Sequence, residues 1–444
     1  MRHLIPDAVW TPDGLKKGWQ VSIDEGVIVA VGPASAEERG GERLAGKLLL
    51  PGLVNAHSHA FQRAFRGHVQ WTRSDDDSFW TWRDAMYGQA NRLSPEGIEA
   101  VSALAFLEMA EAGVTEVGEF HYLHHQPDGT RYADPDELGR RVIAAALRVG
   151  IRITLLRVAY ASSSPGEPLN PDQRRFGDSS PDEVLGAAER LSAHPDPRVS
   201  VGIAPHSIRA VPLEWMPELA TFTGPIHTHV SEQPAEVRAS LEAYGGSPLH
   251  LLDQQGLVSD RFTAVHMTFP EPGDAAILRA RGARICVCPS TELDLGDGFL
   301  PLELRKGIEL CVGSDSHAQI DLFHEARALE LHGRPLANRR HILTPVGERH
   351  GLAEALLQAA TRSGARALGR DGHAVQVGAS ADLIAVQLDR PAAQGVPALE
   401  AAAFNANPDW VEDVWVGGER IATGGRHPRR DEIVRAASEW LPTA

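Results

Sequence analysis

The middle of the chain alternates between short apolar runs and longer amphipathic segments, and this alternation restricts the fold more than any other feature. Strand-like runs lie at residues 48–56, 114–122, 151–160, 199–207, 226–232, 262–268, 284–291 and 309–316. Helix-like segments separate most of them, for example at 95–112, 135–149, 181–191 and 274–281. This order predicts a parallel sheet, and eight such units predict a closed (β/α)8 TIM barrel.

Both ends of the chain differ from the middle, because short strands and turns dominate at 20–31, 381–386 and 413–418. We therefore expect one small β-sandwich domain formed from both termini, residues 1–48 together with 374–444. The barrel would then span residues 49–373. Residues 162–180, rich in serine, proline and arginine, are expected to form a long loop after the third barrel strand.

Charge and composition narrow the class of partner. The formal net charge of -16 disfavours binding to nucleic acid, although local arginines could still bind a small acidic substrate. No apolar run reaches the roughly 18 residues needed to cross a membrane, and the first residues lack the apolar stretch of a secretory signal. Cys286, Cys288 and Cys311 lie in apolar runs and suggest no disulfide framework. We expect a cytoplasmic protein without membrane or nucleic-acid partners.

Ionisable side chains collect where the predicted strands end. The first run ends in His57 and His59, which are two residues apart and so point to the same side of a strand. Other strand ends carry, in order, His229 followed by Glu232, then His266, then Asp315. Each could by itself be an ordinary core or loop residue. The same bias at four strand ends instead favours a shared metal site with a carboxylate beside it for acid–base catalysis.

These motifs resemble the amidohydrolase superfamily. The resemblance rests on HSH at 57–59 after an apolar strand with Pro51-Gly52, HTH at 227–229, His266 and GSDS at 313–316. It implies one divalent metal ion held by the side chains of His57, His59, His229 and Asp315. Superfamily members with two metals use a carboxylated lysine in mid-barrel. This chain has no lysine between Lys47 and Lys306, so we expect a single ion.

The chemistry expected of this site follows from its charge. Nitrogen-rich ligation suits zinc, with iron or manganese as alternatives, and a net positive site lowers the pKa of a bound water. Asp315 would take a proton from that water, and His266 would steady the attacking oxygen. Glu232 would then carry the proton to a leaving nitrogen, which departs as ammonia.

Segments around the metal motifs resemble, more narrowly, the formimidoylglutamate deiminase family. They include HAFQRA at 59–64, DSFWTWRDAMY at 77–87, EFHYLHH at 119–125 and APHSIR at 204–209. By this resemblance the substrate contacts are Gln62, Arg83, Tyr122, His206 and Arg209. A small acidic amidine would suit them, because arginine binds carboxylates through paired hydrogen bonds. Family members commonly pair, so a homodimer is expected.

Several alternatives stay open at this stage. The same metal site could deaminate a heterocycle such as guanine, which would favour aromatic stacking and amide contacts over two arginines. The barrel could also be a non-catalytic scaffold, although the complete set of ionisable residues argues against this. Sequence patterns do not separate N-formimino-glutamate from N-formimino-aspartate, and Arg83 or Arg209 could be ordinary surface or salt-bridge residues.

Overall fold

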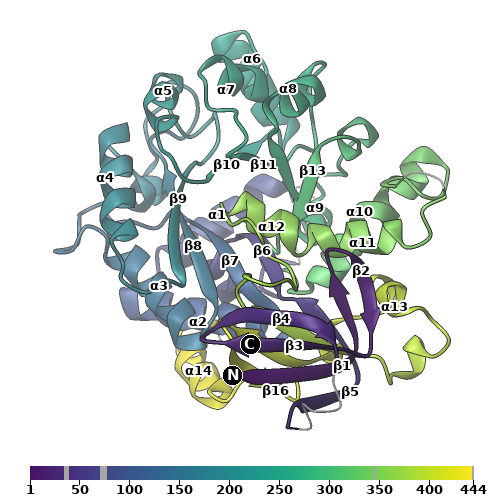
Figure 1. The fold of residues 1–444 in the computed structure, drawn as a ribbon. Helices are drawn as coiled ribbons and strands as arrows, with labels where there is room; N and C mark the ends of the chain where they lie inside the picture. Colours follow the sequence, from purple (N-terminus) through teal and green to yellow (C-terminus); the bar gives the residue numbers. More distant parts are fainter. Residues whose placement is uncertain (35–39, 71–77, 345–346, 443–444) are drawn as a thin grey trace.

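The computed structural model describes residues 1–34, 40–70, 78–344 and 347–442. Within these ranges eight parallel strands follow one another around a barrel in sequence order, from β6 to β13 (Figure 1). They are β6 (Leu53–Ser58), β7 (Val114–His121), β8 (Arg152–Ala159), β9 (Val199–Pro205), β10 (Ile226–Val230), β11 (Phe262–His266), β12 (Arg284–Val287) and β13 (Glu309–Val312). The predicted (β/α)8 barrel is confirmed.

The barrel closes where its first strand meets the segment after its last. A parallel bridge pairs Ser58 with Asp315, and the Asp315 N–H donates to the carbonyl of His57 at 3.0 Å. Gly313 permits this approach, because a Cβ there would lie 2.7 Å from the Cβ of His57. Barrel closure therefore brings residues far apart in sequence to one point.

The predicted helices form on the outside of the barrel, with ends marked by local sequence. They include α2 (Pro95–Glu111), α3 (Glu137–Val149), α4 (Pro181–Ser192) and α8 (Asp274–Arg281). The side chain of Ser94 caps α2, accepting from the Gly97 N–H at 3.3 Å. Gly150 ends α3 in the left-handed conformation, with φ 92°. The capping residues of both helices are thus explicit in the sequence.

A second, mixed sheet combines strands from both ends of the chain, as expected. Its order is β16 (Glu419–Thr423), β15 (Val411–Val416), β14 (Leu383–Gln387), β5 (Glu42–Pro51), β1 (Arg2–Thr11), β3 (Trp19–Asp24) and β4 (Val27–Pro33), with β2 (Gly14–Lys17) paired to β1. In Figure 1 the purple N-terminal strands and the yellow-green C-terminal strands lie together below the barrel. This sheet has its own core, which includes Leu4, Val21 and Trp415.

Three segments differ from the sequence-based expectation. The run at 48–56 is two strands, because Leu48 to Pro51 pair with β14 in the terminal sheet and the barrel begins at Leu53. Residues 48–51 and all of β6 are buried, so periodicity does not separate the two strands. The run at 284–291 ends as a strand at Val287, and Pro289 starts helix α9 (Pro289–Asp294). The loop at 162–180 contains a 3-10 helix, η2 (Pro171–Phe176).

The division of the chain into domains at residues 48 and 374 stays a prediction. Among the described residues, no helix combines the length and apolar character needed to cross a membrane.

Candidate metal and substrate site

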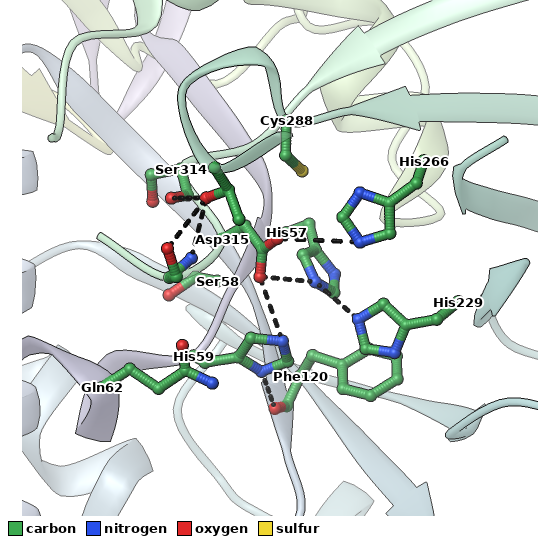
Figure 2. A network of polar contacts seen from close by, with 12 residues as sticks. His57, Ser58, His59, Gln62, Phe120, His229, His266, Cys288, Ser314 and Asp315 are labelled. Atoms are coloured by element: carbon green, nitrogen blue, oxygen red, sulfur yellow. Dashed lines mark hydrogen bonds and ion pairs between the residues drawn. The ribbon is translucent and has the colours of Figure 1, made fainter. Parts of the chain in front are cut away.

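Four side chains from three places in the barrel converge on one point at its carboxyl end (Figure 2). They are His57 and His59 at the end of β6, His229 on β10 and Asp315 after β13, and their potential ligand atoms all lie within 4.8 Å of one another. The Asp315 Oδ1 is 3.4 Å from the Nε2 of His57 and 3.2 Å from the Nε2 of His59. The Nε2 atoms of His57 and His229 are 3.2 Å apart.

Backbone carbonyls fix the orientation of two of these rings. The Nδ1 of His59 lies 2.9 Å from the carbonyl of Phe120, and the Nδ1 of His229 lies 3.1 Å from the carbonyl of His206. A carbonyl only accepts hydrogen bonds, so each Nδ1 carries a proton, and Nε2 is the atom of each ring that is left to bind a metal. Burial lowers the pKa of His57 to about 3 and that of His229 well below its usual value. Neutral imidazoles are the form that binds metal.

Asp315 supplies the negative charge of the cluster. Its backbone has φ 46°, a conformation uncommon for a residue with a side chain, and is held there by hydrogen bonds with the backbone of His57 and His59. Burial by itself would raise the pKa of Asp315, but its contacts with the two rings outweigh burial and keep it well below its usual value. Three imidazoles and one carboxylate suit a divalent cation.

His266 and Glu232 stand beside this cluster. The Nε2 of His266 is 3.5 Å from Oε1 of Glu232 and 3.7 Å from Oδ2 of Asp315, and its Nδ1 is 3.3 Å from Oε1 of Glu292. Burial would lower the pKa of His266, but the carboxylates of Glu232, Asp315 and Glu292 raise it to about 10. Burial raises the pKa of Glu232. The arrangement provides a hydrogen-bond donor and a carboxyl group capable of moving a proton, side by side.

A small cavity of about 40 Å³ opens onto the cluster, and all five predicted substrate contacts line it together with Glu232. These five are Gln62, Arg83, Tyr122, His206 and Arg209. A larger cavity of about 310 Å³ lies between the β1–β2 hairpin and α11 (Gly351–Ala359) and contains none of the clustered ligands. We assign the candidate site to the smaller cavity, because that is where the reactive groups converge.

Two guanidinium groups meet at one wall of this cavity. The Cζ atoms of Arg83 and Arg209 lie 4.6 Å and 5.5 Å from the ring centre of Trp80. Arg209 is buried, and among the described residues no carboxylate lies within ion-pair distance of it. Arg83 is 3.9 Å from Asp84, a mostly exposed carboxylate. Glu236 and Glu232 act on Arg209 only from beyond ion-pair distance, and two guanidinium groups at one wall suit an anionic ligand.

The other predicted contacts form a polar surface beside the cluster. The amide of Gln62 donates to the Tyr122 hydroxyl at 2.9 Å, and its own oxygen is buried with no hydrogen-bond partner among the described residues. The ring of His206 packs between Tyr122 and Tyr160, and its pKa is lowered well below the usual value by burial and then by Arg209. These positions leave polar atoms available to a ligand.

Sequence reasoning missed further residues of this cavity. Tyr160 directly follows β8 and lines the cavity. Like the histidines, it stands where a predicted barrel strand ends, so the sequence carried a signal for it. Tyr87 lies on α1 (Phe79–Ala90) within the segment that carries Arg83, but no periodicity marks it. Asp77, the first residue of that motif, lies outside the described residues.

The neighbouring histidines after β7 have other partners. The Nε2 of His124 is 3.0 Å from the carbonyl of Val158, and the Nε2 of His125 is 2.8 Å from the carbonyl of Gly177. They bind backbone and do not join the metal cluster.

A parallel barrel that gathers histidines and an aspartate at its carboxyl end defines a class of hydrolase. The chain belongs to the amidohydrolase family, which matches residues 48–421. It is a hydrolase acting on carbon–nitrogen bonds.

The chain is similar to several individual deaminases and to a further amidohydrolase. The chain is 37% identical to the formimidoylglutamate deiminase of Pseudomonas aeruginosa over 99% of both chains. It is 28% identical to a 5-methylthioadenosine/S-adenosylhomocysteine deaminase of Natronomonas pharaonis over 90% of this chain and 86% of that one. An amidohydrolase from Brucella melitensis has a solved structure with TM-score 0.93 and 34% identity over 99% of both chains. A zinc-bound adenosine deaminase from Xanthomonas campestris reaches TM-score 0.83 and 28% identity, over 99% and 97%.

Proposed function

We propose that this protein hydrolyses N-formimino-L-glutamate to N-formyl-L-glutamate and ammonia, a step of histidine degradation. The observation that most supports this is the pair Arg83 and Arg209 in the cavity that opens onto the His/Asp cluster: among the described residues no carboxylate lies within ion-pair distance of the buried Arg209. Two cations at one wall favour an acidic substrate. The similarity to the Pseudomonas aeruginosa deiminase supports the same choice.

The proposed cofactor is one Zn²⁺ ion held by His57, His59, His229 and Asp315. The potential ligand atoms of these four side chains all lie within 4.8 Å of one another, and His59 and His229 each turn Nε2 toward that point, so the donor set fits a metal. No lysine stands between Lys47 and Lys306 to form a second-metal bridge, which favours a single ion. When bound, the ion acts as a Lewis acid that lowers the pKa of a coordinated water.

In this proposal the chain's own groups move the protons. Asp315 accepts a proton from the attacking water through Oδ2, the oxygen that faces His266. His266 donates from Nε2 to the oxygen that adds to the formimino carbon. Protonated Glu232, 3.5 Å from that same Nε2, gives its proton to the formimino nitrogen as the water oxygen bonds to the carbon. When the adduct collapses, its hydroxyl proton returns to Glu232 and the proton held by Asp315 passes to the leaving nitrogen, so in net balance both water protons depart in ammonia and both carboxyl groups are restored.

Substrate orientation is assigned to the remaining contacts. The guanidiniums of Arg209 and Arg83 bind carboxylate, and Gln62, Tyr122 and His206 hold the part of the substrate nearest the metal. A homodimer is a further proposal that rests on the family resemblance. A cytoplasmic location is another, and it rests on the three cysteines, which suggest no disulfide framework.

The test follows ammonia release from N-formimino-L-glutamate by zinc-loaded protein. Glu232→Gln should lower kcat by about 100-fold or more, since a positioned proton carrier contributes on that scale. Arg209→Met should raise KM by roughly 10- to 100-fold and change kcat little, because it removes a charge-assisted contact. Arg92→Met, at an exposed arginine outside the cavity, is the matched control. Ammonia from 5′-deoxyadenosine but not from N-formimino-L-glutamate would overturn the proposal.

A further inference from the structure

A glutamine lies behind the cavity wall, in contact with two of the tyrosines that line it. The Nε2 of Gln173 is 2.9 Å from the hydroxyl of Tyr160 and 3.1 Å from the hydroxyl of Tyr87. The two hydroxyl oxygens are 3.3 Å apart. Gln173 is fully buried and does not itself line the cavity. It can therefore act on a ligand only through the tyrosines.

The structure fixes which end of the Gln173 amide faces the tyrosines. Its Oε1 accepts a hydrogen bond from the backbone N–H of Asn170 at 3.1 Å, and the Asn170 side chain accepts from the N–H of Gln173 at 3.1 Å. This reciprocal capping begins the 3-10 helix η2. A backbone N–H can only donate, so the oxygen must face Asn170 and the NH₂ group must face the hydroxyls.

Counting protons shows what the two hydroxyls offer to the cavity. Each oxygen accepts one hydrogen of the Gln173 amide, so both phenolic protons need acceptors elsewhere. One proton can lie between the two oxygens, and the other has no acceptor among the described residues. Burial raises the pKa of Tyr160 well above its usual value, which keeps its proton in place. At least one O–H is thus available to a ligand.

The same wall carries Arg83 and Arg209. The Cζ of Arg83 lies 5.5 Å from the ring centre of Tyr87, and Tyr160 and Arg209 both line the cavity. The groups available here are guanidinium N–H and phenolic O–H, all of them donors. A carboxylate accepts several hydrogen bonds and donates none, so it matches this wall.

We propose that Gln173 is a positioning residue for a carboxylate subsite in which Tyr87, Tyr160 and Arg209 bind the ligand. Gln173 occupies the acceptor sites of both tyrosines and so turns a phenolic proton toward the cavity. The inference deepens the proposed function and rests on it for the identity of the substrate. Selectivity for a dianionic substrate would then depend on the loop after β8, through a residue that never touches the substrate.

The decisive variant is Gln173→Glu. A glutamate can still accept from the Asn170 N–H, so the start of η2 is preserved. Its second oxygen, however, faces the tyrosines as an acceptor, draws both phenolic protons away from the cavity and adds a negative charge. Tyr160→Phe is the second variant and removes one donor directly. Gln126→Glu, at an exposed glutamine, is the control for the change in charge.

Two measurements are made on the zinc-loaded protein: calorimetric binding of glutarate, and KM and kcat for N-formimino-L-glutamate. We expect Gln173→Glu to weaken glutarate binding and raise KM by at least about tenfold, with kcat within about threefold of wild type. Tyr160→Phe should likewise weaken glutarate binding and raise KM, and Gln126→Glu should change neither. A loss of fold or of general activity would lower kcat instead of raising KM selectively.

The outcomes separate this inference from the proposed function. If wild type releases ammonia but Gln173→Glu and Tyr160→Phe leave KM and glutarate binding within twofold, the subsite is wrong and the function stands. If no ammonia is released but glutarate binds and Gln173→Glu weakens it, the function is wrong and the subsite stands. If the wild type neither releases ammonia nor binds glutarate, both the proposed function and the subsite are overturned. Should Gln173→Glu not fold, Tyr160→Phe decides by the same criteria.

Discussion

Gly313→Ala tests whether the contact that closes the barrel also sets the metal ligands. Gly313 does not have positive φ, so alanine meets no backbone restriction there, and the effect is steric. A Cβ at this position would lie 2.7 Å from both the Cβ and the carbonyl oxygen of His57, atoms that cannot rotate away. The end of β13 must therefore move away from β6.

The size of that movement follows from the contact distances. Ordinary van der Waals contact begins near 3.4 Å, so the two segments must separate by about 0.7 Å. Metal–ligand distances tolerate only about 0.2 Å, and Asp315 is two residues beyond the altered position. We expect zinc affinity to fall by roughly 10- to 100-fold, the range found when ligand orientation is disturbed. Overpacking should also cost about 1–3 kcal/mol in the free energy of unfolding.

Zinc affinity is measured by competition with a chromophoric chelator, and the free energy of unfolding by denaturant titration of the metal-free protein. Gly32→Ala on β4 is the control, because a Cβ there meets nothing within 4 Å and its φ is also not positive. Unchanged zinc affinity and unchanged stability in Gly313→Ala would refute the argument that this spacing is tightly set.

Two further predictions concern groups outside the site. Glu325 is buried and its pKa is raised by burial from 4.5 to about 8, so the folded protein binds more protons than the unfolded chain between those values and stability should fall as pH rises through them. Glu325→Gln should flatten that fall in unfolding titrations, and an identical pH slope would contradict the assignment. Arg157 forms a buried ion pair with Asp178, so Arg157→Met should cost about 3–5 kcal/mol in the free energy of unfolding. Adding Asp178→Asn should recover part of that loss, and a cost below about 1 kcal/mol would show that Asp178 is solvated.

Local patterns in the amino-acid sequence are enough to predict the barrel and the positions of its reactive residues along the chain. Alternating strand and helix patterns are local, and parallel strands all carry their carboxyl ends to one face. Residues such as His57, His229 and Asp315 could therefore be assigned to one end of the barrel without coordinates. The two-residue spacing of His57 and His59 further placed both on one side of a strand.

Features that depend on contact between distant segments of the chain follow only from the folded structure. The division of residues 48–56 between two sheets follows from pairing with β14, more than 300 residues further along the chain, and leaves no trace in local periodicity. Likewise, nothing in the sequence shows that no described carboxylate lies within ion-pair distance of Arg209, or that Gln173 reaches Tyr87 and Tyr160. Periodicity reports which way a side chain points along its own element. Whether a charge is paired or a hydroxyl has an acceptor depends on neighbours that only the folded chain brings together.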